Sequence, residues 1–138
     1  MKTDYVGVRI YGRTVVEVVF DDGHREKLPH RVICHSPSGF DWGYGGSGPA
    51  ELALNILVDA LEDRARCTVC KGKTRYRGGM CPGCRGLGIA DEVWRAHQEF
   101  KWTWIAGLPE RSWSIALVDV LEWWDRIGAQ LGVQEAFL

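Results

Sequence analysis

Two pairs of cysteines in the middle of the chain restrict its fold more than any other feature of the sequence. Cys67 and Cys70 form one Cys-x-x-Cys pair, and Cys81 and Cys84 form the second after a gap of ten residues. At this spacing, four thiolates can occupy the corners of a tetrahedron around one Zn²⁺ and leave no position for a substrate. We therefore expect one structural zinc ion with these four cysteines as its ligands.

Glycines follow each pair where a zinc-binding turn needs them. Gly72 and Gly86 stand two residues after the second cysteine of their pair, and glycine accommodates the positive φ that turns backbone N–H groups toward the sulfurs. The second segment, CPGCRGLG, resembles the CxxCxGxG repeat of the cysteine-rich zinc domain of DnaJ. The first segment, CTVCKGKT, departs from the repeat at Thr74, where a glycine would stand. The resemblance implies zinc binding and does not carry over chaperone activity.

Disulfide bonds and redox chemistry are the alternatives for these cysteines. Because no secretory signal opens the sequence, we expect a reducing, cytoplasmic location, in which disulfides are rare. A redox Cys-x-x-Cys motif usually occurs as a single pair beside a βαβ unit. No apolar run approaches the roughly 18 residues of a membrane-spanning helix, so no membrane partner is expected. Cys34, the fifth cysteine, is expected to be buried and not to bind metal.

Basic residues are concentrated around the cysteine pairs. Residues 64–90, which we call the zinc lobe, contain seven of the 17 basic residues and none of the 18 acidic ones. The rest of the chain, which we call the body, therefore has a balance of −8, whereas four thiolates and one Zn²⁺ leave the lobe near about +5. At this length the lobe is too small to bury a core without metal. We expect one domain, residues 1–138, in which the lobe is an insertion.

The segments on either side of the lobe predict an α+β fold. The predicted strands are residues 5–11, 14–20, 25–28 and 32–34. Gly12-Arg13 has the spacing of a tight turn between the first two strands, so the chain should begin with an antiparallel sheet.

Three helices are expected to pack on this sheet. They begin at Pro49, at Asp91, and at Ser112 or Ser114, and they end near Glu62, before Gly107, and near Ile127. Proline is tolerated in a first helical turn, and Gly128 stands where a C-terminal stop is expected. The first helix is mostly apolar, with a polar stripe at Glu51, Asn55, Asp59 and Glu62. The prediction is a small N-terminal antiparallel sheet packed by about three helices, with a zinc-knuckle hairpin inserted between the first two.

Residues 35–54 contain a second motif. Their sequence, HSPSGFDWGYGGSGPAELAL, resembles the signature HSPxGFxWGYGGSGPAxLAL of the DUF6166 family of small uncharacterised proteins. The preceding hairpin and residues 106–113 are also similar to that family. The resemblance implies a shared fold outside the lobe and an origin in a phage or mobile element, and it implies no reaction. It makes the zinc lobe a departure from the family pattern.

The glycines of this motif have two interpretations. Backbone N–H groups ahead of the first helix can cradle a phosphate or carboxylate, and this candidate anion site consists of Gly45, Gly46, Ser47 and Gly48. Alternatively, the glycines allow close packing of Phe40, Trp42 and Tyr44 against the sheet. An enzyme is less favoured, because Cys34 and His35 would point to opposite faces of a strand and no Gly-x-Ser-x-Gly elbow is present.

Two functions fit the sequence best. The first is a non-catalytic, zinc-containing interaction protein that binds and modulates or inhibits a host macromolecular complex, with Trp102 and Trp123 as exposed anchors. The second is a nucleic-acid-binding protein in which Tyr76 stacks on a base and cations of the lobe contact phosphates. These cations are Lys71, Lys73, Arg75, Arg77 and Arg85. A small enzyme or an anion sensor using the glycine-rich stretch is a third possibility. The sequence favours the first function, because it contains no catalytic constellation and because the −8 balance of the body opposes the approach of a long duplex.

Overall fold

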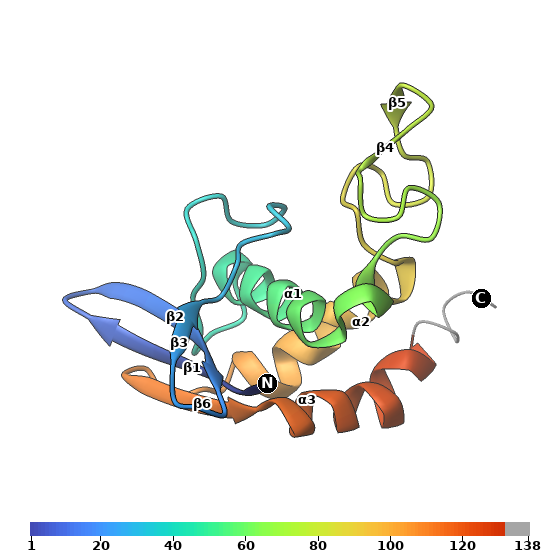
Figure 1. Cartoon of the computed structure of the whole chain (residues 1–138). Helices are drawn as coiled ribbons and strands as arrows, with labels where there is room; N and C mark the ends of the chain where they lie inside the picture. The colour runs from blue at the N-terminus through green and yellow to red at the C-terminus, as the bar shows by residue number, and fades with distance from the viewer. Residues whose placement is uncertain (132–138) are drawn as a thin grey trace.

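The computed structural model describes residues 1–131 and confirms an α+β fold, with the zinc lobe projecting from the body (Figure 1). The strands are β1 (Lys2–Ile10), β2 (Arg13–Phe20), β3 (Arg25–Lys27), β4 (Arg75–Tyr76), β5 (Gly79–Met80) and β6 (Ser112–Ala116). The helices are α1 (Ser47–Leu61), α2 (Asp91–Phe100) and α3 (Leu117–Trp123), with a 3-10 turn at Glu62–Ala65 and π-helical turns at Lys101–Ile105 and Trp124–Gly128. None of the described helices is long and apolar enough to cross a membrane.

The body is built on a four-stranded antiparallel sheet in the order β3-β2-β1-β6. The predicted hairpin forms, but its turn consists of Tyr11 and Gly12, because Ile10 pairs with Arg13. Both turn residues have positive φ, 49° and 77°, as the two-residue turns that match the twist of a hairpin require. The expected turn at Gly12-Arg13 is therefore wrong by one residue.

The fourth strand replaces the beginning of the expected third helix. Residues 112–116 pair with β1, so that Val6 lies opposite Ser114. Trp113 and Ile115 are buried, whereas Ser112 and Ser114 are exposed. This alternation has the period of a strand, and the serines, which we interpreted as helix caps, form its outer side.

The third helix begins at Leu117 and continues through the π-helical turn to residue 131. Gly128 does not end it, contrary to the expectation. A Cβ atom at Gly128 would lie 2.5 Å from the ring of Trp124 and 2.8 Å from that of Trp123. This glycine is thus explained by close packing of two indoles and not by a helix end.

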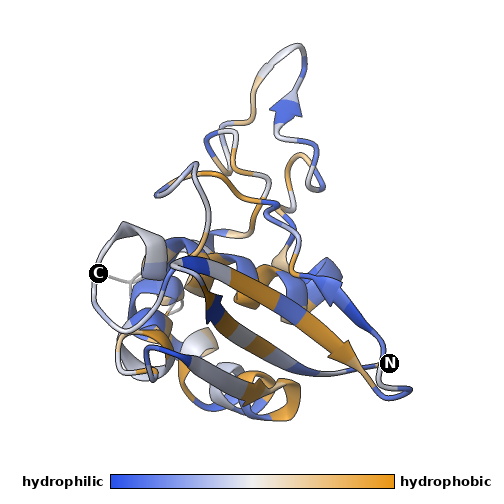
Figure 2. Ribbon diagram, turned by 90° about the vertical axis from the view of Figure 1, so that its left-hand side faces the viewer, coloured by the Kyte–Doolittle hydropathy of each residue, from blue (hydrophilic) through white to orange (hydrophobic). Residues whose placement is uncertain are grey.

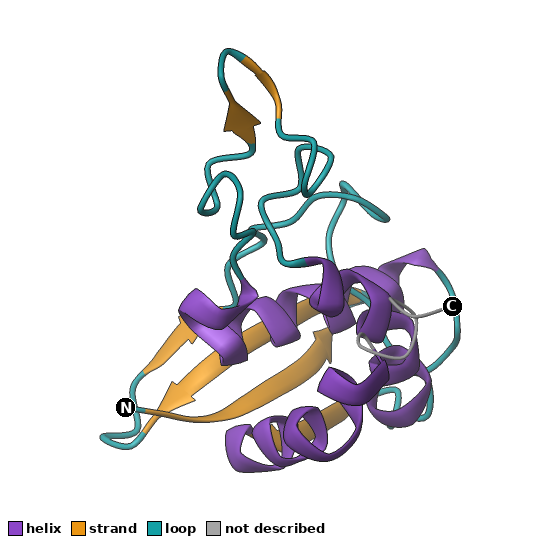
Figure 3. Ribbon diagram, turned by 90° about the vertical axis from the view of Figure 1, so that its right-hand side faces the viewer, coloured by secondary structure: helices purple, strands orange, loops and turns teal. Residues whose placement is uncertain are grey.

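All three helices cover the same face of the sheet. Figures 2 and 3 view the molecule from opposite sides, and the sheet lies in front in the first and behind the helices in the second. Tyr5, Val16 and Val18 point from the sheet into the core, where α1 is buried on nearly all sides. The predicted helix starting near Pro49 is confirmed as the central element of the body.

Candidate metal centre

The zinc lobe leaves and re-enters the body through a short antiparallel stalk. Ala90 N–H donates to the carbonyl oxygen of Ala65 at 2.7 Å, and Cys67 N–H donates to that of Gly88 at 3.0 Å. Arg66 and Ile89 form a β-bridge between these two bonds. Because the stalk closes the lobe at its base, the segment between α1 and α2 is a loop whose two ends lie side by side.

The two cysteine turns have the same backbone conformation. After Cys70, Lys71 and Gly72 have φ of 55° and 83°, and after Cys84, Arg85 and Gly86 have φ of 55° and 82°. In each turn the N–H three residues after the second cysteine donates to the carbonyl oxygen of that cysteine at 3.1 Å. The glycines thus stand where the sequence predicted that positive φ is needed.

The four thiols converge in the arrangement that a tetrahedral metal requires. All four sulfur atoms lie within 4.8 Å of one another, and each cysteine is at most 7% exposed. The Sγ atoms of Cys67 and Cys81 are 3.8 Å apart, and those of Cys70 and Cys84 are 3.6 Å apart. A tetrahedral Zn²⁺ with Zn–S bonds of about 2.3 Å separates its sulfur ligands by about 3.8 Å. The four side chains therefore fit a closed zinc site.

The surroundings of the thiols differ in how they affect ionisation. Burial acts to raise the pKa of Cys70, but hydrogen bonds, the strongest from the Thr74 backbone, lower it to about 7. Burial raises the pKa of Cys84 to about 11, although the N–H of Gly88 donates to its sulfur at 3.2 Å. A bound divalent ion would favour the thiolate form of the cysteines that bind it.

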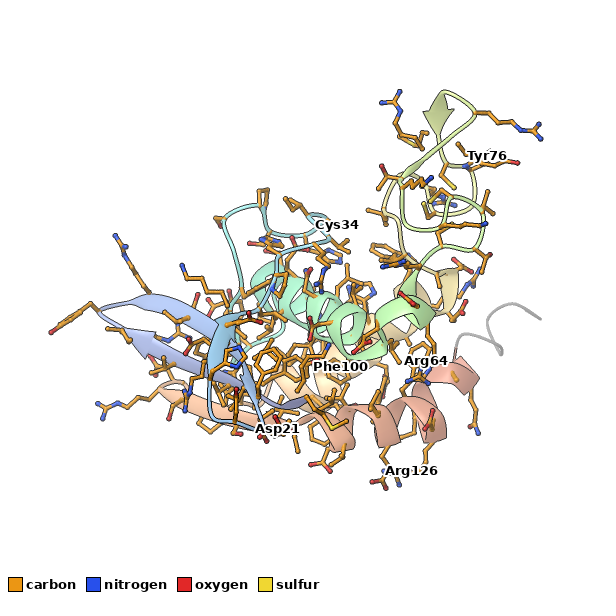
Figure 4. The ribbon with its side chains drawn as sticks, in the orientation of Figure 1. Asp21, Cys34, Arg64, Tyr76, Phe100 and Arg126 are labelled. Carbon is orange, nitrogen blue, oxygen red and sulfur yellow. The ribbon has the colours of Figure 1, made fainter. Side chains whose placement is uncertain are left out.

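The outer end of the lobe is a hairpin of β4 and β5 with Tyr76 near its tip (Figure 4). Arg77 and Gly78 form the turn, with φ of 52° and 82°. Tyr76 is 39% exposed, and the guanidinium of Arg77 lies 5.2 Å from the centre of its ring. The tip therefore presents an aromatic ring beside a cation.

Most cations of the lobe have no counter-ion in the part of the chain that the structure describes. At its base, Arg64 lies 4.0 Å from Asp125 and Arg66 lies 3.3 Å from Asp63. Five exposed cations form no ion pair with any residue among 1–131, namely Lys71, Lys73, Arg75, Arg77 and Arg85. Lys71 and Lys73 also line a cavity of about 630 Å³ between lobe and body.

The two tryptophans expected at the surface have different positions. Trp102 is 60% exposed, and the ammonium of Lys101 lies 4.5 Å from the centre of its ring. Trp123 is only 2% exposed and packs edge-to-face on Phe100 at 5.2 Å. Its assignment as a contact residue is therefore wrong, because it lies on the face of α3 that the core covers.

The glycine-rich stretch is packed tightly at the start of α1. A Cβ atom at Gly45 would lie 2.1 Å from the ring of Trp102, and one at Gly48 would lie 2.7 Å from the Cβ of Asp41. Asp41 accepts hydrogen bonds from Arg9 and Tyr44. A Cβ atom at Gly46 would likewise lie 2.4 Å from the ring of Tyr44, so close packing explains three of the four residues of the candidate anion site. The Asp41 carboxylate already lies beside the helix start.

Three residues of the polar stripe, Glu51, Asn55 and Asp59, form a buried network on α1 that sequence reasoning missed, whereas Glu62 is exposed. Glu51 is fully buried, and its carboxylate accepts hydrogen bonds from the backbone N–H groups of Cys34, His35 and Ser36 at 3.0–3.3 Å. It also lies 2.8 Å from His30 Nε2. Burial acts to raise the pKa of Glu51, but these hydrogen bonds lower it below its usual value. The only signal for this network in the sequence was the recurrence of a polar residue every fourth position, at 51, 55 and 59, in an otherwise apolar helix.

Asn55 and Asp59 continue this network along α1. Asn55 accepts a hydrogen bond from Val32 N–H and donates one to the carbonyl oxygen of Val32. Asp59 accepts from Tyr5 Oη at 2.8 Å and pairs with Arg31 at 3.0 Å. The strand expected at 32–34 is therefore absent from this described segment, because helix side chains take the place of a neighbouring strand.

Cys34 lies on this irregular segment and is exposed, so the expectation that it is buried is wrong (Figure 4). Its backbone N–H donates a hydrogen bond to the Glu51 carboxylate, and this bond helps to fix the backbone of residues 34–36. Partial removal of the sulfur from solvent and the nearby Glu51 carboxylate raise the pKa of its thiol. Cys34 is not part of the thiol cluster, as predicted.

The comparisons with known proteins identify one family. A family model described as "Family of unknown function (DUF6166)" matches residues 5–73, half of the 138-residue chain. The match includes the first cysteine pair, so only residues 74–90 of the lobe lie outside it, and it does not reach residues 106–113. No curated protein and no solved structure matches the chain.

Proposed function

The chain belongs to the DUF6166 family, which supplies no activity, and from this premise we propose that it is a non-catalytic nucleic-acid-binding protein whose zinc lobe contacts the phosphates. The observation that carries the proposal is the group of five lobe cations without a counter-ion among the described residues. Unpaired cations gathered on one projecting element suit a polyanion better than an ordinary protein surface.

The metal would give these cations a fixed arrangement. The lobe contains few buried apolar groups apart from its cysteines, so its shape depends on the four thiolates. When cations are held in place before binding, less conformational entropy is lost on contact with the phosphates. Zinc binding and nucleic-acid binding should therefore be coupled.

The tip of the lobe has the composition of a single-strand contact. Tyr76 is partly exposed, and an exposed ring can stack on any base because every base has a π-face. The negative balance of the body opposes the close approach of a long duplex. A short or unpaired segment of nucleic acid, reached by the lobe alone, is the target that fits both features.

The test is a mobility shift of short oligonucleotides by the zinc-loaded protein at low salt. Arg75→Glu/Arg77→Glu should weaken binding at least about tenfold, because two phosphate contacts become repulsive. Arg13→Glu/Arg25→Glu makes the same change of charge on the exposed sheet and should have a small effect. If wild-type protein causes no retardation at low salt, or if both variants bind equally, the proposal is wrong.

A second candidate is the modulator of a host macromolecular complex that the sequence favoured. Its specific support is Trp102, a large exposed ring beside the Lys101 ammonium, since such rings often anchor protein interfaces. The burial of Trp123 removes the other anchor, and for this reason we rank this function second. Capture from a nuclease-treated lysate distinguishes the two functions: a protein retained by wild type but not by Trp102→Ala would favour the modulator.

A further inference from the structure

Three side-chain nitrogens meet outside the zinc lobe, where the irregular segment after β3 touches α2. His35 Nε2 lies 2.9 Å from His97 Nε2, and Gln98 Nε2 lies 3.3 Å from the same atom. A neutral imidazole has only one acceptor nitrogen with one lone pair. The nitrogens of His35 and Gln98 therefore both lie next to the single lone pair of His97 Nε2.

The protonation of His97 follows from its other ring nitrogen. His97 Nδ1 is in hydrogen-bond contact with the carbonyl oxygen of Trp94. A carbonyl oxygen can only accept, so Nδ1 carries the proton and Nε2 presents its lone pair toward His35. Burial, the largest cause, lowers the pKa of His97 to about 4, so the ring is neutral at pH 7. Metal-binding histidines are usually oriented by such a bond from the second nitrogen.

We propose that His35 and His97, assisted by the side-chain amide of Gln98, form a second divalent-cation site that prefers Zn²⁺, Ni²⁺ or Cu²⁺. Metal–nitrogen bonds of 2.0–2.1 Å place two ligands about 2.9 Å apart at a right angle and about 3.3 Å apart at the tetrahedral angle. The 2.9 Å between the Nε2 atoms of His35 and His97 matches two ligands at a right angle. Gln98 lies next to this pair and could bind the ion only through its amide oxygen. Imidazole nitrogen suits these ions better than Mg²⁺ or Ca²⁺.

The ligands are held in place by their surroundings. His35 N–H donates to the buried Glu51 carboxylate at 3.0 Å, and the His35 ring stacks on Trp94 with an interplanar angle of 8°. The ring of His97 lies 4.6 Å from that of Trp94. Both rings are thus fixed before an ion arrives, which lowers the entropic cost of binding.

An ion has a route to the site. His97 and Gln98 line a cavity of about 760 Å³ that extends between α2 and the zinc lobe. Gln98 is exposed, so its amide can rotate to present the oxygen atom. Water can occupy the remaining coordination positions from this cavity. The site differs from the four-thiolate centre in having open positions.

The test is calorimetric titration of Ni²⁺ into zinc-loaded protein, with zinc content measured before and after. We expect one equivalent of bound Ni²⁺ with the lobe zinc retained. His35→Gln should weaken this binding roughly tenfold or more, while its amide can still donate to His97. His24→Gln is the matched control, because His24 lies in an exposed turn and should leave the binding unchanged.

A spectroscopic measurement keeps the inference separate from loss of folding. Paramagnetic Ni²⁺ should broaden the imidazole NMR signals of His35 and His97 before that of His30, which is bound to Glu51. Three results would contradict the proposed site: release of the lobe zinc by Ni²⁺, the same Ni²⁺ affinity in His35→Gln as in wild type, or the same loss of Ni²⁺ affinity in His35→Gln and His24→Gln. None of these outcomes depends on nucleic-acid binding by the lobe.

Discussion

Thr74 and Gly88 occupy equivalent positions, four residues after the second cysteine of their pairs, and both have positive φ, 69° and 80°. This conformation suits Gly88, whereas a β-branched side chain is strained there. The departure of the first turn from the DnaJ-like repeat is therefore a local cost and not a change of backbone. The rest of the lobe holds Thr74 in this conformation against the preference of its side chain.

Thr74→Gly should increase the affinity of the lobe for zinc. Relief of the strain outweighs the entropy cost of glycine, and we expect zinc to bind about fivefold more tightly, equivalent to about 1 kcal/mol. Competition with a chelator measures this change. Thr68→Gly is the control in the same turn, because φ is not positive there, and it should weaken zinc binding slightly. Equal effects of the two substitutions would contradict this explanation.

Glu51 is the residue on which the irregular segment 30–36 depends most. Glu51→Gln should lower the free energy of unfolding by about 3 kcal/mol, because it replaces a buried carboxylate that accepts several N–H bonds with an amide that cannot accept all of them. Glu62→Gln, an exposed change one residue beyond the same helix, should cost less than about 1 kcal/mol. Urea unfolding measures both.

The Glu51 carboxylate should also make the free energy of unfolding depend on pH. The pKa of Glu51 is lowered in the folded protein, so its contribution is present above its unfolded pKa of about 4.3 and is lost as the pH falls through the lower folded value. Wild-type protein should therefore lose stability below about pH 4, and Glu51→Gln should lose less over this range. Parallel curves for the two proteins would show that Glu51 contributes nothing to this dependence.

At the scale of elements, the zinc lobe is connected to the body by the stalk at residues 65–67 and 88–90, which continues into α1 and α2. The ion pair of Arg64 with Asp125 adds a contact at its base. The sheet, α1, α2 and α3 share one apolar core, and the four cysteines form a separate cluster. The two parts therefore differ in their source of stability: burial of apolar groups stabilises the body, and a metal ion bound by the four cysteines would stabilise the lobe.

Cys67→Ser/Cys70→Ser should thus abolish stoichiometric zinc without unfolding the body. Far-ultraviolet circular dichroism should change little, while limited proteolysis should cut within residues 64–90. Cys34→Ser is the control, since Cys34 is exposed and outside the thiol cluster, and its zinc content should equal that of wild type. Global unfolding of the double variant would contradict the independence of the two parts.

At the scale of the whole molecule, the basic residues are concentrated on the part of the chain that projects from the body. The lobe extends away from the sheet (Figure 1) and carries the unpaired cations, while the body holds all the acidic residues. A polyanion can therefore approach the lobe tip while staying distant from much of the negative charge. Long-range repulsion and short-range attraction act on different surfaces, and salt screens both.

Binding of nucleic acid should consequently depend strongly on salt. If about five lobe cations each neutralise one phosphate, the slope of log affinity against log salt should be roughly −3.5 for a single strand and −4.5 for a duplex. Titration at several salt concentrations gives the slope, and Arg75→Glu/Arg77→Glu should reduce its magnitude. A slope near zero would be inconsistent with phosphate contacts by the lobe.

Features that depend on neighbours along the chain could be predicted from the sequence: the cysteine turns with their glycines, the first hairpin, the central helix and the separation of charge. Features that depend on contacts between distant residues became clear only in the folded protein. Residues 112–116 are a strand because β1 offers them a partner, and residues 32–34 are not, because Asn55 and Glu51 occupy their backbone groups. Trp123 is buried and Cys34 exposed for the same reason: burial depends on which elements pack around a residue, and local pattern does not contain this information.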